Sequence, residues 1–134
     1  MVEKGDAVAE FNGFQECPSC RLGWKTRDDL LKDKNLQLIG YQANLRDLEK
    51  GFYLFNHVIS RCLTTLSVSV NKFFDLYAID RHTISSYGTE DCEGRCLRVS
   101  DLNRCRAKCK NAFAREILVS LLKDYPHLRQ PRDD

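Results

Sequence analysis

The clearest period in this chain is an alternation of apolar and polar residues near its middle. Leu66, Val68 and Val70 are separated by single serine residues, which is the two-residue period of a strand with one buried face. Two apolar runs, at residues 36–43 and 51–55, precede this segment and have the length and aromatic content of strands. The three stretches together predict a small antiparallel sheet.

The predicted sheet covers about residues 36–70 and contains one irregular point. Gly40 lies inside the first strand, where a glycine weakens the ladder of hydrogen bonds or marks a β-bulge. The second strand, at residues 51–55, is apolar on both sides, so we expect it to be the central strand.

Helix signals lie on both sides of the sheet. Cap-type residues beginning at Thr26 precede two leucines and predict a short helix. Asn71 is the predicted cap of a second short helix over residues 72–78. The longest helix is predicted over residues 101–124 and ends before Pro126. These helices, packed against the sheet, assign the chain to the α+β class.

Length and composition fit one globular domain. The chain has 134 residues, of which 43% are hydrophobic and 30% are charged, as in ordinary soluble proteins. A chain of this length can bury a core of its own, so we predict a single domain over residues 1–134. Residues 1–14 show no sustained period and are expected to form a flexible arm.

The N-terminal residues predict the cellular compartment. They lack the basic stretch and the apolar run of a secretory signal. No apolar stretch in the chain approaches the roughly 18 residues that a membrane span requires. We therefore expect a cytoplasmic protein with no membrane partner. The net charge of +2 is too small, taken alone, to indicate binding to nucleic acid.

The seven cysteines change this picture most. Six of them form three close pairs, and Cys62 lies alone in an apolar stretch; the pairs are Cys17 with Cys20, Cys92 with Cys96, and Cys105 with Cys109. In a reducing compartment, close thiol pairs are more often metal ligands or redox groups than structural disulfides. We predict that these six cysteines bind metal. Zinc is the expected ion, and an iron–sulfur cluster is the alternative.

The first pair stands in the segment Cys17-Pro-Ser-Cys20, which Gly23 follows. This segment resembles the knuckle of zinc ribbons and rubredoxin-type sites, and the resemblance implies backbone amides that point at the two sulfurs and stabilise thiolates. Gly23 is expected to supply a positive φ. A tetrahedral site needs four ligands, so two more must come from far along the chain or from another subunit. The alternatives are a redox dithiol and a plain turn with two partly exposed thiols.

The other two pairs share the spacing Cys-x3-Cys, at Cys92–Cys96 and at Cys105–Cys109. The pattern resembles the twin CX3C motif of helical-hairpin proteins, in which four cysteines form two nested disulfides. The shorter separation of the pairs in this chain and the expected reducing compartment favour a metal over disulfides. On the predicted helix over residues 101–124, Cys105 and Cys109 would lie on the buried stripe.

Two ligand sets follow from these pairs. One set joins Cys17 and Cys20 to two C-terminal thiols in a single zinc site, which would tie the N-terminal arm to the long helix. The other set uses the four C-terminal cysteines as a self-contained site. Both arrangements satisfy the requirement for four ligands, and the sequence leaves both open.

Basic residues surround the C-terminal pairs. Residues 95–115 include seven basic side chains and one acidic side chain, and nearby cations would stabilise a metal bound by anionic thiolates. Arg106 and Lys110 stand next to cysteines and are assigned to the site. The opposite face of the helix is expected to be solvated and carries Arg104, Lys108 and Arg115. The same basic face would serve a nucleic-acid-binding protein.

Catalysis is not predicted. His57 and Cys62 would make a Cys–His nucleophile pair, but no third group orients them, and a cysteine in an apolar run is usually a core residue. The remaining interpretation is a cytoplasmic zinc module that acts through a protein partner or self-association, in regulation or sensing. One alternative is an iron–sulfur or thiol-based redox sensor or electron carrier. A second is a nucleic-acid binder that uses the basic C-terminal helix.

Overall fold

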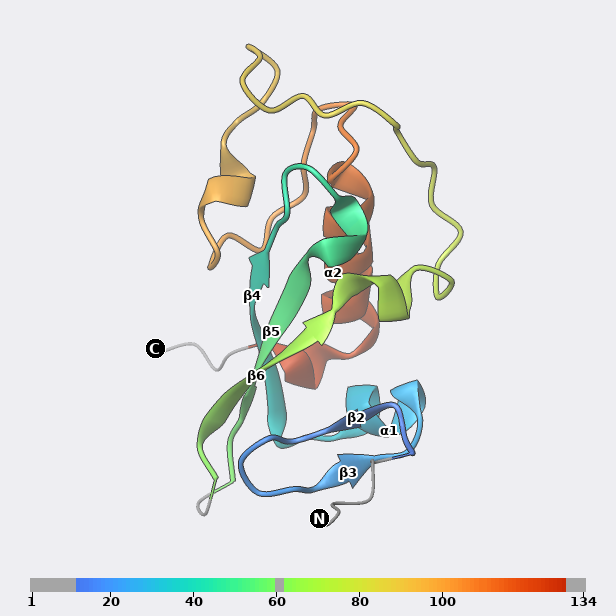
Figure 1. Cartoon of the computed structure of the whole chain (residues 1–134), viewed down its shortest axis with the longest axis vertical. Coiled ribbons are helices and arrows are strands. Elements are labelled where there is room, and N and C mark those ends of the chain that lie inside the picture. Colours follow the sequence, from blue (N-terminus) through green and yellow to red (C-terminus); the bar gives the residue numbers. More distant parts are fainter. Residues whose placement is uncertain (1–11, 60–61, 130–134) are drawn as a thin grey trace, which may run out of the picture.

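The main sheet has three antiparallel strands. The computed structural model describes residues 12–59 and 62–129. The strands, in their order across the sheet, are β4 (Leu36–Gln42), β5 (Phe52–His57) and β6 (Thr64–Ser69) (Figure 1). The predicted α+β class, the three strands and the central place of the second strand are therefore confirmed.

Gly40 interrupts β4, as predicted. The pairing register between β4 and β5 shifts between Leu38 and Gly40, which is the mark of a β-bulge. The Tyr41 amide donates a hydrogen bond of 2.9 Å to the Val99 carbonyl, so a distant segment covers this edge of the sheet. A Cβ atom on residue 40 would lie 2.8 Å from Val99 Cγ1, and this close approach requires glycine.

One helix covers a face of the sheet. Helix α2 (Ala112–Asp124) contributes Ile117 and Leu121 to the core that it shares with the strands (Figure 1). The Tyr53 hydroxyl of β5 donates a buried hydrogen bond of 2.6 Å to the Ala114 carbonyl, which ties the helix to the central strand. Burial of each large apolar side chain stabilises such a core by roughly 1.5–3 kcal/mol.

A smaller unit closes one end of the sheet, at the bottom of Figure 1. It consists of a hairpin of β2 (Gln15–Glu16) and β3 (Gly23–Trp24), followed by helix α1 (Arg27–Lys32). The Thr26 hydroxyl accepts a hydrogen bond of 3.0 Å from the Asp29 amide, and the Asp29 carboxylate accepts one from the Thr26 amide. This reciprocal cap begins the helix, and it confirms the short helix predicted after Thr26.

The predicted helix over residues 101–124 is wrong in its first half. Helix α2 begins at Ala112, and the second Cys-x3-Cys pair lies in irregular chain before it. The reason is a competing side chain. The Arg115 guanidinium donates hydrogen bonds of 2.7 and 3.0 Å to the carbonyls of Asp101 and Asn103, so these carbonyls already have donors other than helix amides.

The connection between the sheet and α2 has little regular structure. A 3-10 turn at Val70–Phe73 stands where a helix over residues 72–78 was predicted, and a second turn lies at Arg95–Leu97. Figure 1 shows the long segment 80–111 arching over the end of the molecule opposite the hairpin. The pair Cys17–Cys20 on the hairpin therefore lies at one end of the long axis. The two Cys-x3-Cys pairs lie at the opposite end.

The predicted N-terminal arm falls largely outside the described residues, which begin at Asn12. Phe14, the last residue of that arm, packs edge-on against Phe73, with ring centroids 5.7 Å apart. None of the described helices is long and apolar enough to cross a lipid bilayer.

Candidate metal centre

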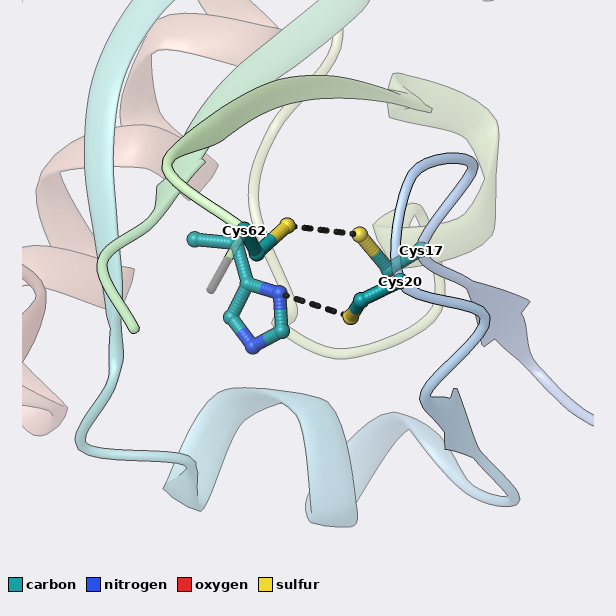
Figure 2. Close-up of side chains that lie close together, drawn as sticks. Cys17, Cys20 and Cys62 are labelled. Atoms are coloured by element: carbon teal, nitrogen blue, oxygen red, sulfur yellow. Dashed lines mark hydrogen bonds between the residues drawn. The ribbon is translucent and has the colours of Figure 1, made fainter. Parts of the chain in front are cut away.

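Four potential metal ligands meet beside the hairpin; they are Cys17, Cys20, His57 and Cys62. Their ligand atoms all lie within 4.8 Å of one another. Figure 2 shows the sulfurs of the hairpin cysteines facing the loop that carries Cys62. Cysteine sulfur and histidine nitrogen are the ligands that zinc, copper and iron prefer in proteins. The cluster can therefore hold a metal ion.

The knuckle sequence supplies two of these ligands from the turn of the β2–β3 hairpin. The Cys17 amide donates a hydrogen bond of 2.8 Å to the Leu22 carbonyl, and the Arg21 amide donates one of 3.0 Å to the Cys17 carbonyl. These bonds close the turn with Cys17 buried and Cys20 exposed. The positive φ predicted for Gly23 is wrong. Arg21 has it instead, at 67°, because Gly23 already belongs to strand β3.

His57 is the last residue of β5, so the sheet fixes its position. Its Nδ1 lies 3.6 Å from Cys20 Sγ, and its ring packs edge-on against the Trp24 indole with centroids 5.3 Å apart. Its Nε2 is buried and has no hydrogen-bond partner among the described residues. Nδ1 is therefore the ring nitrogen that faces the sulfurs and can bind a metal.

Cys62 reaches the cluster from the loop between β5 and β6. Its sulfur lies 3.5 Å from that of Cys17. The next residue, Leu63, has a left-handed φ of 50°, a strained conformation for leucine, and β6 begins directly after it. Cys62 packs against the core, as expected, but it is half-buried and its sulfur also lies in the cluster.

The two closest sulfurs differ in acidity. Burial raises the pKa of Cys17, and the amides of Cys20 and Ser19 offset only part of that rise. Burial also opposes ionisation of Cys62, but hydrogen bonds, first from Thr64 and then from Cys17, outweigh it and lower the pKa to about 6. Thiolates bind metals far better than thiols, so the lowered pKa of Cys62 favours metal binding at this sulfur.

The four C-terminal cysteines are arranged differently. They line one small cavity at the opposite end of the molecule from the hairpin; they are Cys92, Cys96, Cys105 and Cys109. Within the described parts of the chain, no three of their sulfurs lie within 4.8 Å of one another. The single site that would join the hairpin cysteines to two of them is not formed. The hairpin cysteines instead meet a histidine and a cysteine from the β5–β6 region.

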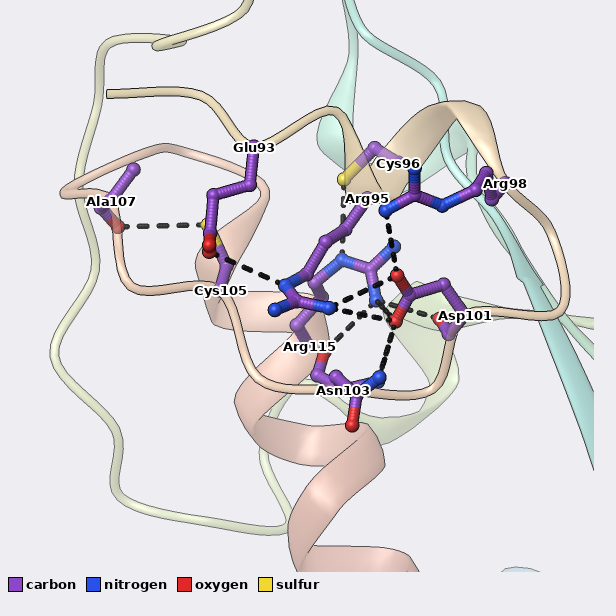
Figure 3. Close-up of polar contacts among 9 residues, drawn as sticks. All are labelled: Glu93, Arg95, Cys96, Arg98, Asp101, Asn103, Cys105, Ala107 and Arg115. Atoms are coloured by element: carbon purple, nitrogen blue, oxygen red, sulfur yellow. Dashed lines mark hydrogen bonds and ion pairs between the residues drawn. The ribbon is translucent and has the colours of Figure 1, made fainter. Parts of the chain in front are cut away.

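Arg115, assigned from the sequence to a solvated face, is fully buried beside these cysteines (Figure 3). Its Nε donates a hydrogen bond of 3.4 Å to Cys96 Sγ. The carboxylate of Asp101 lies 3.9 Å from Arg115 and is shared with Arg95 and Arg98, at 3.1 and 3.2 Å. The assignment to solvent is wrong because the chain before α2 is irregular and folds back over this side chain.

Arg106 and Lys110, which the sequence assigned to this site, make other contacts than Arg115 does. The Lys110 ammonium donates a hydrogen bond of 2.5 Å to the Arg46 carbonyl, and Arg106 is exposed. The cation in contact with a cysteine sulfur is therefore Arg115.

Acidities within the C-terminal group are also uneven. Burial raises the pKa of Cys105, and the nearby thiols of Cys109 and Cys96 raise it further. Burial opposes ionisation of Cys109 as well, but hydrogen bonds, first from the Ser86 amide, outweigh it and lower the pKa. Cys109 is therefore the more acidic thiol of its Cys-x3-Cys pair.

Sequence reasoning did not identify His57 and Cys62 as ligands, although a signal was present. A histidine ends the central strand, and a cysteine stands just before the next strand. A hairpin brings such positions together at one end of a sheet. The knuckle at Cys17 and Cys20 lacks two ligands for a tetrahedral site. His57 and Cys62 supply these two ligands.

Comparison of the chain with protein-family models, with curated proteins and with solved structures gave no match. Its function is therefore inferred from the geometry of this centre.

Proposed function

We propose that Cys17, Cys20, His57 and Cys62 bind one zinc ion. For Zn–S bonds of about 2.3 Å and Zn–N bonds of about 2.0 Å, tetrahedral geometry sets the sulfur–sulfur edge at about 3.8 Å and the sulfur–nitrogen edge at about 3.5 Å. The Cys17–Cys62 and Cys20–His57 contacts measure 3.5 and 3.6 Å. The observation that carries the proposal is the convergence of four ligand atoms within 4.8 Å, with two opposite edges close to the tetrahedral lengths.

Such a zinc ion would be structural. Four protein ligands fill its tetrahedral coordination and leave no open position for a substrate. The ligands lie on the hairpin and at the end of the sheet, and the two hairpin strands pair over only two residues each. Because metal binding adds folding free energy, the ion would fasten a hairpin that its own hydrogen bonds hold weakly.

A zinc-fastened surface would suit partner binding. Leu22, Val58 and Leu63 each lie within two residues of a ligand and are 45%, 38% and 73% exposed. Single exposed apolar residues are ordinary, but these three stand on the loops that carry the ligands. We assign the module a role in regulation or sensing through contact with a protein partner or a second copy of itself. A cytoplasmic location fits this role, because zinc binding needs reduced thiols.

The metal content of the purified full chain tests the zinc proposal. Cys20→Ser and His57→Asn each remove one ligand, so we expect each variant to contain one zinc ion fewer than the wild type by elemental analysis. His82 is exposed and distant from the cluster in sequence, and His82→Asn is the matched control that should keep the wild-type content. Unchanged zinc in both ligand variants would contradict the proposal.

A thiol switch is the second candidate function, and one contact favours it. The sulfurs of Cys17 and Cys62 lie 3.5 Å apart. Hydrogen peroxide would oxidise the pair: the S–S bond forms, the O–O bond breaks, and both thiol protons leave in water. Counting free thiols before and after peroxide separates the functions, because bound zinc would protect the pair. An iron–sulfur cluster, the other redox alternative, would absorb visible light and bleach on reduction.

Nucleic-acid binding receives less support from the geometry. Of the three residues on the predicted basic face, Arg115 is buried, Arg104 pairs with Glu116, and Lys108 is exposed. The helix that would have aligned them is not formed at residues 101–111. A binder that neutralises phosphates would lose affinity steeply with added salt. Titration with duplex DNA at two salt concentrations would reveal such binding.

A further inference from the structure

The four C-terminal cysteines are among the residues that line one small cavity. Its walls carry Cys92, Cys96, Cys105 and Cys109, and its free volume is about 20 Å³. A volume of this size holds one water-sized body. The cavity therefore has room for one small ion beside four residues that carry thiols.

Two N–H groups point at sulfurs of this cavity. The Ser86 amide donates to Cys109 Sγ at 3.2 Å, and Arg115 Nε donates to Cys96 Sγ at 3.4 Å; the second contact is drawn in Figure 3. A neutral thiol is a weak acceptor, whereas an ionised acceptor forms the stronger hydrogen bonds. The donors therefore fit sulfurs that carry negative charge.

A buried positive charge next to the cavity lacks a full counter-charge. Arg115 is fully buried, and its Nη2 has no hydrogen-bond partner in the described part of the chain. Asp101 serves Arg95 and Arg98 as well as Arg115, and Glu93 adds a second carboxylate through Arg95. Three guanidinium groups thus share two carboxylates. Buried charges require pairing, and thiolates in the cavity would supply the missing negative charge.

The cavity also lies at the centre of the longest irregular part of the chain. Residues 80–111 contain, apart from bends and turns, only the 3-10 turn at Arg95–Leu97. Loops of such length without regular structure are uncommon in compact domains. A cross-link among the four cysteines would supply the stabilisation that helices or strands supply elsewhere.

We propose that Cys92, Cys96, Cys105 and Cys109 bind a second zinc ion, at the end of the molecule opposite the hairpin site. The four sulfurs are wider apart than the hairpin ligands, so binding an ion requires that these side chains and the irregular segment that carries them move together. The cavity suits one ion rather than an iron–sulfur cluster, whose several atoms need more room. Arg115 is a positioning residue of this site, because it holds Cys96 and offsets the thiolate charge.

Counting metal ions on the full chain and on paired variants tests this second site. Native mass spectrometry should show two zinc ions on the wild-type chain. Cys105→Ser and Cys20→Ser should each retain one ion, because each removes a ligand from a different site, and the double variant should retain none. After exchange into cobalt, Cys20→Ser should show stronger sulfur-to-metal absorption than Cys105→Ser, since four thiolates then bind the remaining ion instead of three.

The outcomes separate the two sites. Zinc that is lost in Cys20→Ser and fully retained in Cys105→Ser would overturn the second site and leave the first intact, and the opposite result would do the reverse. Two disulfides that peptide mapping of the wild-type chain locates among the four C-terminal cysteines would also overturn the second site.

Should a variant fail to fold, alkylation of the native wild-type chain decides the question. The four C-terminal cysteines should be protected from iodoacetamide while metal is bound and should react after a chelator removes it. Equal reaction of these cysteines with and without the chelator would overturn the proposal.

Discussion

At the hairpin end of the molecule, four ligand atoms from distant parts of the chain meet within 4.8 Å. At the other end, four cysteines on one irregular stretch line a cavity and stay further apart. Strand pairing creates the first arrangement, because His57 ends β5 and the knuckle forms the turn after β2. The second arrangement depends on side chains, above all on the buried Arg115.

This difference teaches what an incoming ion must do at each end. The four ligand atoms already lie within 4.8 Å of one another, and two pairs of them lie 3.5 and 3.6 Å apart, so an ion would bind there with little rearrangement. The C-terminal cysteines lie in a described segment without strands, so an ion would have to draw their sulfurs together. We therefore expect the hairpin site to be preorganised and the C-terminal site to gain much of its order on binding.

Replacement of Arg115 should have the largest effect and should fall on the second region. Arg115→Met keeps an unbranched side chain but removes the donors to the carbonyls of Asp101 and Asn103. Removing one partner from a buried charged network costs about 3–5 kcal/mol. We expect the free energy of unfolding, measured with urea, to fall by about this amount.

Arg104→Met is the matched control for that change. Arg104 is exposed and pairs with Glu116, and an exposed ion pair contributes at most about 1 kcal/mol. Zinc at the hairpin should remain bound in both variants. Equal losses of stability in the two variants would show that Arg115 does not support the second region.

A methyl group on Gly40 tests how the second region is docked on the sheet. The added Cβ would lie 2.8 Å from Val99 Cγ1 and 3.0 Å from the Val99 carbonyl, and overpacking of this kind costs about 1–3 kcal/mol. In Gly40→Ala we therefore expect lower stability and faster hydrogen exchange at the Tyr41 amide, which is bonded to that carbonyl.

The double variant Gly40→Ala/Val99→Ala gives the control for docking. It removes the side-chain part of the clash and should recover part of the lost stability. Without any recovery, the requirement for glycine would belong to the β-bulge and not to the approach of Val99.

The smallest effect is expected at the cap of α1, next to the hairpin. Thr26→Ala removes the hydroxyl that accepts from the Asp29 amide, and loss of such a cap costs about 1 kcal/mol. Thr26→Ser keeps a hydroxyl and should lose much less, as measured by thermal unfolding. Zinc content should not change in either variant, because α1 carries no ligand. Loss of zinc in Thr26→Ala would mean that α1 holds the knuckle in position.

The strands and the first helix could be predicted because their signals are local. The alternation at Leu66 and Val68 marks β6, Gly40 marks the bulge in β4, and Thr26 caps α1 within a few residues of each feature. In each case the residues that decide the structure are close neighbours in the sequence.

The start of α2 and half of the hairpin cluster depend on contacts between distant residues, so the sequence pattern misses them. The helical spacing of Cys105 and Cys109 favours a helix, but Arg115 takes the carbonyls that such a helix would use. Cys17 meets Cys62, which is 45 residues away in the chain. Only the pairing of β5 with β6 and the packing of the hairpin bring these sulfurs together.

The order of the four ligands Cys17, Cys20, His57 and Cys62 along the chain has a consequence for biosynthesis. All of them precede Leu63, whereas helix α2 begins only at Ala112. During translation the ligands would therefore leave the ribosome well before the helix that covers the sheet. An ion captured at that stage would secure the nascent hairpin while its later neighbours are still being made, so the supply of metal during synthesis would influence the yield of correctly folded chains.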